Sequence, residues 1–292
     1  MTETKIGFIG QGFIGKHMAD DFADRGLEVV RYALEEEYVG NREAIANCDI
    51  VFIAVPTPTT PEGFNCDALR AVLSLVGPEK IAVIKSTILP GTTQQLQSEF
   101  PEIILLHSPE FLREKHAAED TRSPERNIIG IVEDNETYHA AARNVLAVLP
   151  HAPQEVVCKA EEAELIKYGG NVFLAMKVVY MNLLYDLTQS LGVDYEVIAT
   201  TMSADSRIGD SHMRVIDRSG HPGSTPGRGA GGHCFPKDLA ALRELYEKQL
   251  ANDATGCDLL RMLEQKNREL LEQSGKDLDL LAGIYGDTKS SG

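Results

Sequence analysis

The first half of the chain alternates short apolar runs with longer amphipathic stretches. The apolar runs are rich in Val and Ile and are mostly continuous, which is typical of strands that helices cover on both faces of a parallel sheet. Amphipathic stretches between them, such as 16–25 and 136–149, predict the covering helices. We therefore expect a doubly wound, mainly parallel α/β sheet with right-handed crossovers. The predicted strands are 5–9, 28–32, 50–55, 81–84, 103–106 and 127–132.

The pattern changes near residue 155. Apolar residues recur close to a 3.6-residue period over about 161–191 and occupy more than one face, which predicts one long helix. This helix is too apolar for a solvated connector, so we expect it to pack on a second copy of the chain in a homodimer. Further helices are predicted near 194–202, 237–248 and 257–274, with a loop rich in Gly, Pro and Ser at 219–232.

These patterns predict a sheet domain over 1–155, an all-helical domain over 156–275 and a C-terminal tail over 276–292. The chain of 292 residues suits two domains of roughly 100–200 residues each. With 28 Lys and Arg against 44 Asp and Glu, its net charge of −16 argues against a nucleic-acid partner. No apolar run approaches the roughly 20 residues that span a bilayer, so no membrane partner is expected.

The cysteines and histidines show none of the usual metal-site spacings. Five cysteines are widely separated and form no C-x-x-C pair, which excludes a disulfide framework and a cysteine-based zinc site. The histidines show no H-E-x-x-H pattern, and we predict no metal. The N-terminus lacks the layout of a signal peptide, and together these features favour a reducing cytoplasm.

A glycine-rich turn, Gly10-Gln11-Gly12-Phe13-Ile14-Gly15, follows the first predicted strand and precedes a helix. In this context Gly10 permits a tight turn, Gly12 lets the backbone approach a pyrophosphate, and Gly15 permits close helix–strand packing. The helix N-terminus then faces the phosphates. The first domain is therefore interpreted as a Rossmann-type dinucleotide-binding domain.

The choice between NAD and NADP is less clear from the sequence. An acidic residue usually ends the second strand and holds the ribose, but Ala33 occupies that position. One of the glutamates at 35–37 could substitute for it, or these could form a solvated turn. Arg31 could instead favour the 2′-phosphate of NADP. NAD is the predicted cofactor, and NADP stays open.

Five further segments contain side chains that could take part in catalysis or ligand binding. The first three follow predicted strands, at the edge where open α/β sheets bind ligands. They are V-P-T-P-T at 55–59, K-S-T-I-L-P-G-T at 85–92, S-P-E-F-L-R-E at 108–114, E-L-I-K-Y-G-G-N at 164–171 and G-G-H-C-F-P-K-D at 231–238. In this order, from Lys5 to about Asn267, the chain resembles the UDP-glucose/GDP-mannose dehydrogenase family, most closely its members that act on UDP-glucose. The resemblance implies oxidation of the C6 alcohol of a nucleotide sugar to a carboxylate with two NAD.

Cys234 is the candidate nucleophile. Oxidising an alcohol twice at one site passes through an aldehyde, which a thiolate can hold as a thiohemiacetal and then as a hydrolysable thioester. Gly231 and Gly232 admit a ligand closely, and Lys237 supplies a cation that favours a thiolate. The alternative is a buried structural cysteine, which is the interpretation for Cys48, Cys66, Cys158 and Cys257.

Lys167 and Asn171 lie four residues apart and share one face of the long helix. The resemblance implies that they polarise the substrate oxygen and stabilise the developing oxyanion, for which an ammonium and an amide are suited. Gly169 and Gly170 lie between them and suggest close approach of a ligand or another backbone. The alternative is a solvated lysine and an ordinary asparagine.

The resemblance implies the remaining roles, and for each of them a purely structural role stays open. Glu110 would be the general acid/base for thioester hydrolysis, Thr87 would hold an ordered water, and Asp238 would orient water or Lys167. Glu114 would lie near the nicotinamide, and Lys237 would contact a cofactor phosphate. The predicted cofactor contacts are Gly10, Gly12, Phe13, Ile14, Gly15, Val55, Pro56, Thr57, Ser86, Thr87, Glu114 and Lys237. The predicted substrate contacts are Glu110, Phe111, Leu112, Arg113, Lys167, Asn171, Gly229, Gly231 and Gly232.

Two stretches depart from the family. The segment between Tyr32 and Asp49 is short, which leaves the adenosine contacts undefined. Typical members also continue into another α/β domain that binds the substrate nucleotide. A truncated chain, a partner subunit that supplies this surface, or a substrate with less of a nucleotide could each explain the difference. The polar residues after 257–274 favour a naturally short chain.

Two other functions remain open. A two-electron 3-hydroxyacid or phosphogluconate-type dehydrogenase shares the Rossmann domain, the helical domain and the Lys–x–x–x–Asn pair, but its chemistry does not need Cys234. A cofactor-binding protein without catalysis would need neither the thiol nor an acid/base pair.

Overall fold

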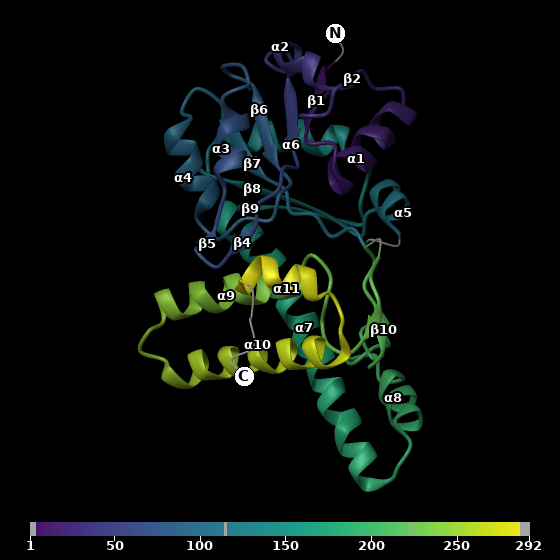
Figure 1. Cartoon of the computed structure of the whole chain (residues 1–292). Helices are drawn as coiled ribbons and strands as arrows, with labels where there is room; N and C mark the ends of the chain where they lie inside the picture. The colour runs from purple at the N-terminus through teal and green to yellow at the C-terminus, as the bar shows by residue number, and fades with distance from the viewer. Residues whose placement is uncertain (1–3, 114–115, 222, 287–292) are drawn as a thin grey trace. The chain divides into compact units, whose positions relative to one another are not determined.

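The computed structural model describes residues 4–113, 116–221 and 223–286, which form two compact units (Figure 1). The first unit comprises Met1–Thr57 and Asn65–Lys167, and the second comprises Pro58–Phe64 and Tyr168–Gly292. This division lies later than the predicted boundary at 155/156. The reason is that the long helix α7 (Ala160–Leu191) begins on the sheet, where Ala160 and Ala163 pack against Gly130, and continues into the second unit.

A seven-stranded sheet forms the centre of the first unit, and its order is β2-β1-β3-β6-β7-β8-β9. Neighbouring strands are parallel, except that β7 and β8 pair antiparallel through Leu106–Ile131 and His107–Gly130. The predicted doubly wound, mainly parallel sheet is therefore confirmed. The strands are β1 (Ile6–Ile9), β2 (Val29–Tyr32), β3 (Ile50–Ile53), β6 (Ile81–Ile84), β7 (Ile104–His107), β8 (Arg126–Ile131) and β9 (Gln154–Lys159).

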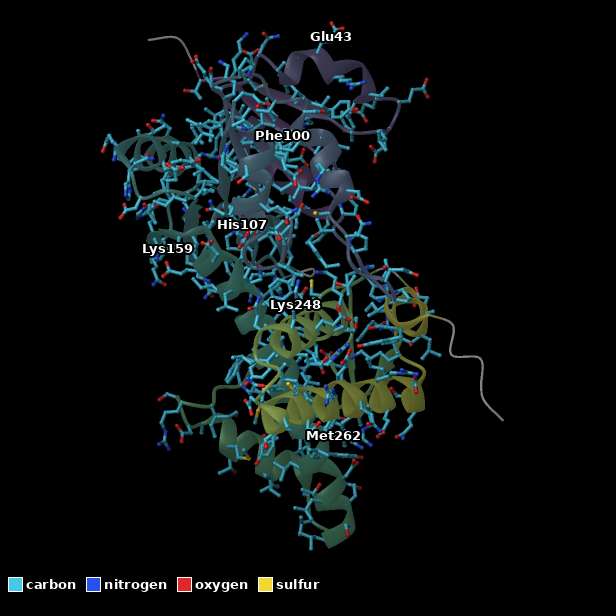
Figure 2. All side chains as sticks on the ribbon, turned by 90° about the vertical axis from the view of Figure 1, so that its left-hand side faces the viewer. Glu43, Phe100, His107, Lys159, Lys248 and Met262 are labelled. Carbon is cyan, nitrogen blue, oxygen red and sulfur yellow. The ribbon has the colours of Figure 1, made fainter. Side chains whose placement is uncertain are left out.

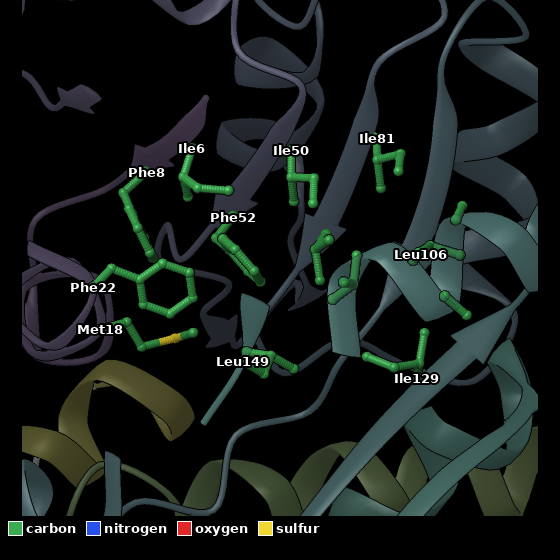
Figure 3. Close-up of a cluster of buried hydrophobic side chains, with 14 of the residues drawn as sticks. Ile6, Phe8, Met18, Phe22, Ile50, Phe52, Ile81, Leu106, Ile129 and Leu149 are labelled. Atoms are coloured by element: carbon green, nitrogen blue, oxygen red, sulfur yellow. The ribbon is translucent and has the colours of Figure 1, made fainter. Parts of the chain in front are cut away.

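The core of the first unit lies between the sheet and its helices. Phe8 of β1 stacks on Phe52 of β3 with ring centroids 5.1 Å apart, because parallel register places them side by side. Phe22 meets both rings edge-on, at 5.2 and 5.4 Å (Figure 3). The helical elements are α1 (Phe13–Asp24), η1 (Val39–Asn41), α2 (Arg42–Ile45), α3 (Asp67–Leu73), α4 (Thr92–Glu99), α5 (Ala117–Arg122) and α6 (Glu136–Val148).

The second unit is mainly helical, as predicted, but it is not all helical. It contains two short hairpins, β4 (Thr59–Thr60) with β5 (Gly63–Phe64), and β10 (Asp217–Arg218) with β11 (Pro226–Gly227). Two-residue strands are too short to give an alternating pattern, so the sequence does not reveal them. Its helices after α7 are α8 (Tyr195–Ser203), α9 (Phe235–Gln249), α10 (Ala254–Ser274) and α11 (Leu278–Tyr285).

Helix α11 corrects the tail predicted over 276–292. Residues 278–285 are helical, Leu281 is buried, and the helix contacts hairpin strand β4. Lys276 and Asp277, just before it, are also buried. Eight residues are too few to show a clear helical period, and because polar residues surround them, the sequence pattern did not predict this helix. Within the described parts of the chain, no helix is both long and apolar enough to cross a membrane.

Candidate active site

The glycine turn adopts the geometry that a dinucleotide phosphate requires. Gly10 has φ +89°, and a Cβ there would lie 2.4 Å from the carbonyl oxygen of Ala54. A Cβ on Gly15 would lie 1.9 Å from the Gly10 carbonyl oxygen, so packing alone requires both glycines. Gly12, at the N-terminus of α1, has no such neighbour, and no side chain caps the helix there. The first N–H groups of α1 therefore lie beside open space, which fits a phosphate.

At the end of β2, Ala33 occupies the usual acidic position and Arg31 has a partner within the protein. Ala33 is buried, and the glutamates at 35–37 are exposed. Arg31 forms an ion pair with Asp20 at 2.6 Å, so its guanidinium is already engaged. Asn41 donates its amide N–H to the Arg31 carbonyl oxygen at 2.9 Å and fixes the short connection after β2.

The segments after β3 and β6 are tied together at the carboxyl edge of the sheet. The Ser86 hydroxyl donates to the Val55 carbonyl oxygen at 2.7 Å. The Thr57 hydroxyl donates to the Thr87 carbonyl oxygen, also at 2.7 Å. These two bonds bring the predicted cofactor contacts Val55, Pro56, Thr57, Ser86 and Thr87 to one place, as expected for neighbouring parallel strands.

Glu110 is held in one orientation by its neighbours. Its Oε2 lies 3.2 Å from Nζ of Lys85, and its Oε1 accepts backbone N–H groups from Phe111 and Leu112 at 2.8 and 3.2 Å. Lys85 also donates to the Ser108 hydroxyl at 3.2 Å. Lys85 is absent from the predicted site. Its position directly after β6 and immediately before the S-T-x-x-P-G-T motif is the sequence feature from which it could have been predicted as a site residue.

A cavity of about 160 Å³ lies beside this pair within the first unit. Glu110, Phe111, Leu112 and Arg113, all predicted substrate contacts, line it together with Lys85. The Phe111 ring faces two cations. Its centroid lies 4.0 Å from the Arg126 guanidinium carbon and 5.3 Å from Nζ of Lys167. Arg113 pairs with Asp120 at 2.5 Å. Lys167 is buried, which removes the alternative of a solvated lysine.

His107 lies inside the first unit at the end of β7 (Figure 2). Complete burial and the nearby charge of Lys85 lower the pKa of His107 to about 3. The ring is therefore neutral at physiological pH and adds no charge near Lys85.

Cys234 lies at the N-cap of α9 and is exposed. Of the other four cysteines, which the sequence analysis interpreted as buried, Cys66 and Cys158 are only half-buried. Cys48 and Cys257 are buried, and burial raises the pKa of the Cys48 and Cys158 thiols to about 11. The exposed thiol at a helix N-terminus removes the alternative that Cys234 is a buried structural cysteine.

One turn along α9, Asp238 is completely buried and joins α9 to α7. It accepts the side-chain amide of Asn171 at 2.5 Å and forms an ion pair with Lys237 at 2.6 Å. Asn171 is therefore not an ordinary surface side chain, and the structure gives Lys237 a partner within the protein. Gly169 and Gly170 are exposed, and a Cβ added to either would meet no atom within 4 Å, so this face of α7 stays open to a ligand or another backbone.

The predicted glycine contacts in the loop before Cys234 have local structural reasons. Gly229 and Gly232 have φ of +87° and +78°, which favour glycine. A Cβ on Gly231 would lie 2.2 Å from the carboxylate of Asp277, a residue that the sequence placed in the tail. Glu114, predicted to lie near the nicotinamide, falls outside the described residues. Within the described ranges, no group of three His, Cys, Asp or Glu side chains could hold a metal ion.

Residues 36–148 match the NAD binding domain model of the UDP-glucose/GDP-mannose dehydrogenase family, and residues 161–269 match its central domain model. The chain belongs to this family. The first match begins after the glycine turn, whose geometry is independent support for a dinucleotide domain. The order of the motifs in the sequence predicted this membership, and the family models confirm it.

Individual proteins named as UDP-glucose dehydrogenases are also similar to this chain. UDP-glucose 6-dehydrogenase of Rickettsia conorii is 32% identical over 259 residues, which cover 86% of this chain and 55% of that protein. A solved UDP-glucose dehydrogenase from Pyrobaculum islandicum has 28% identity and a TM-score of 0.76, covering 91% of this chain and 68% of that one. The chain spans about half the length of the curated relatives it matches first.

The same fold also occurs in a shorter protein. A solved 3-hydroxyisobutyrate dehydrogenase from Mycobacterium tuberculosis has 19% identity and a TM-score of 0.71, covering 97% of this chain and 99% of that one. At this identity the likeness shows the fold alone, so the fold does not separate the two kinds of dehydrogenase.

Proposed function

We propose that the chain is an NAD-dependent nucleotide-sugar 6-dehydrogenase that oxidises a sugar C6 alcohol to a carboxylate, of the UDP-glucose to UDP-glucuronate type. The observation that carries this proposal is the exposed thiol of Cys234 at the N-terminus of α9, one turn from a buried carboxylate that holds Asn171 and Lys237. A two-electron dehydrogenase has no use for such a thiol.

Cys234 forms the covalent intermediates in this proposal. Its thiolate adds to the aldehyde from the first oxidation and gives a thiohemiacetal; loss of a hydride and a proton then gives a thioester. Water attacks the thioester carbonyl, and the thiolate leaves as the carboxylic acid forms. Partial positive charge at the start of α9 stabilises the thiolate in both its attacking and leaving roles. A reducing cytoplasm, the location we propose, keeps this exposed sulfur as a thiol.

Lys167 and Asn171 stabilise negative charge on the substrate oxygen. Lys167 is buried, so its ammonium acts with little screening by water. The Asn171 amide has two N–H bonds, of which Asp238 accepts one and fixes the direction of the other. Glu110 transfers protons during thioester hydrolysis, and Lys85 and the two backbone N–H groups fix its orientation.

The cofactor role belongs to NAD. When bound, NAD accepts the hydride released in each oxidation. The open start of α1 at Gly12, Phe13 and Ile14 would hold the pyrophosphate, and the 55–57 and 86–87 segments, tied together at the carboxyl edge of the sheet, would contact the cofactor there. Arg31 is already paired with Asp20, which favours NAD over NADP because a 2′-phosphate would have to displace that carboxylate.

A homodimer through α7 is part of the proposal. Large apolar side chains remain exposed along this helix, and Ile166, Phe173, Tyr180 and Leu187 recur every seven residues. Met176 and Leu183 lie three residues after Phe173 and Tyr180, so the set forms the stripe of two apolar positions per heptad with which helices pack on each other. Gly169 and Gly170 continue the exposed face where a partner helix can approach closely.

The test is the number of reduced cofactors formed per substrate consumed. The protein is incubated with limiting UDP-glucose, and NADH and UDP-glucuronate are quantified, with NADP in a parallel reaction. The proposal expects two NADH for each UDP-glucose, and C234S is expected to lose UDP-glucuronate formation. A ratio of one, unaffected by C234A, would instead indicate a two-electron dehydrogenase. Binding of NADH by calorimetry without turnover of any nucleotide sugar would indicate a cofactor-binding protein.

A further inference from the structure

A buried carboxylate at the start of α11 holds the glycine-rich loop that leads to Cys234. Asp277 is 5% exposed and accepts three hydrogen bonds from this loop. The donors are the Ser219 hydroxyl at 2.5 Å, the His221 imidazole Nε2 at 2.9 Å and the backbone N–H of Gly232 at 2.7 Å. Asp277 therefore forms hydrogen bonds with residues at both ends of this loop, which begins more than fifty residues earlier in the sequence.

Close packing makes this arrangement specific. A Cβ on Gly231 would lie 2.2 Å from Asp277 Oδ2, so the loop backbone passes directly over the carboxylate. The neighbouring Lys276 is buried and donates to the Gly229 carbonyl oxygen at 3.0 Å. Asp277 itself has φ +55°, a left-handed conformation that Asp and Asn tolerate better than most residues. These features restrict the carboxylate and the loop residues that contact it to one arrangement.

The contacts extend to the residue beside the thiol. The His221 ring lies edge-to-face against His233, with centroids 5.1 Å apart, and His233 immediately precedes Cys234. Two series of contacts thus connect Asp277 to Cys234. One passes through the Gly232 backbone, and the other passes through the His221 and His233 rings. Because Cys234 is the N-cap residue of α9, the path of residues 231–233 decides whether its thiol stays beside the helix N-terminus.

We propose that Asp277, together with His221, is a positioning pair for the Cys234 thiol, which holds the loop so that the sulfur stays at the N-terminus of α9. The pair touches neither substrate nor cofactor in this proposal and acts through the backbone. The proposal rests on the role of Cys234 proposed above. It also makes the segment that contains Lys276 and Asp277 part of the catalytic apparatus rather than a tail.

The test uses D277N with two matched controls. Asn tolerates the same backbone conformation but cannot accept all three hydrogen bonds, because one of its two side-chain atoms is a donor. D279N removes an exposed carboxylate from the first turn of the same helix. L281A destabilises α11 through its buried leucine and leaves the loop contacts in place.

The main readout is the rate at which iodoacetamide alkylates Cys234 as a function of pH, followed by mass spectrometry of tryptic peptide 229–237. Loss of the helix N-terminus moves a thiolate toward the ordinary cysteine value, so we expect the midpoint of this profile to move to higher pH in D277N. H221A should move it in the same direction, and H221Q, which keeps a donor, should recover part of the shift. D279N and L281A should leave the midpoint unchanged.

Turnover provides the second readout. Displacement of the nucleophile should lower kcat of D277N by roughly 10- to 100-fold, with KM for NAD unchanged. An alkylation midpoint that D277N leaves unchanged would overturn the proposal, as would an equal shift in L281A. Either result is distinct from failure of the proposed function, in which the wild-type protein would show no turnover while the alkylation profiles could still differ.

Discussion

Glu164 provides a test of how burial competes with hydrogen bonding in this fold. Its side chain has no exposed surface, and it accepts the backbone N–H of Gly91 at 2.6 Å. It also accepts the backbone N–H and the hydroxyl of Thr93, at 2.8 and 2.6 Å. It therefore caps the start of α4 from α7. Burial raises the pKa of Glu164 from 4.5 to about 7, and the bonds from Thr93 and Gly91 oppose this rise without cancelling it.

The direction of the effect on folding follows from proton binding. The folded protein keeps a proton on Glu164 at pH values where the unfolded chain has released it. The stability that this proton contributes is complete below pH 4.5 and is lost as the pH rises through about 7. At roughly 1.4 kcal/mol per pH unit, the loss is about 3 kcal/mol. The side chain is buried, so solvent screening does not reduce this figure greatly.

The variant E164Q keeps the shape of the side chain and removes its titration. Free energies of unfolding are measured in urea from about pH 5 to about pH 8, and the wild-type value is compared with that of E164Q at each pH. Titrations elsewhere cancel in this difference. We expect the wild type to lose about 2.5 kcal/mol relative to E164Q over this range, because part of the effect has already been lost at about pH 5. E162Q, at an exposed glutamate of the same helix, controls for the loss of a surface charge.

A change of stability in the opposite direction would also be informative. If the three hydrogen bonds at the start of α4 outweigh burial, Glu164 is a stabilising anion, and the wild type gains stability relative to E164Q as the pH rises. That outcome would refute the order of the two effects given above.

Three further predictions follow from individual contacts. K85M leaves the half-buried Glu110 without its cation, so we expect a loss of about 3 kcal/mol in stability and at least a tenfold fall in kcat, measured by urea unfolding and NADH formation. D238N places an amide donor against either Lys237 or Asn171, so one charge-assisted bond is lost. Thermal unfolding should then show a loss of about 1.5–3 kcal/mol in the free energy of unfolding. F173E places a charge in the exposed stripe of α7, and light scattering at micromolar concentration should show a monomer where the wild type shows a dimer; an unchanged mass would refute the interface.

The parts of this protein that the sequence predicted are those that short-range patterns determine. Continuous apolar runs predicted six of the seven strands of the main sheet, because a strand buried on both faces needs such a run. The edge strand β9 was not predicted, because its sequence Q-E-V-V-C-K is partly polar and partly exposed. The glycine turn predicted its own geometry, since Gly10 and Gly15 pack against backbone atoms that no side chain could approach. The antiparallel pairing of β7 with β8 was not predictable in this way, because buried strands have the same composition in either direction.

The partners of the site residues depend instead on contacts between distant parts of the chain. Asn171 and Asp238 were both predicted, but their direct hydrogen bond depends on how α7 and α9 pack, which no local pattern specifies. Lys85 and Asp277 were missed for the same reason, because a lysine after a strand and an aspartate in a polar stretch are ordinary residues until their partners are known.

The glycines before Cys234 show why a motif and its physical cause can lie far apart. Gly231 and Gly232 were attributed to close approach of a ligand, yet the Gly231 Cβ position is already occupied by a carboxylate from the start of α11. A larger residue in place of Gly231 would therefore disrupt the folded loop even without substrate, because the loop could no longer pack over Asp277. The glycine pair is consequently a requirement of the loop that delivers the thiol, and any contact it makes with substrate is additional to that requirement.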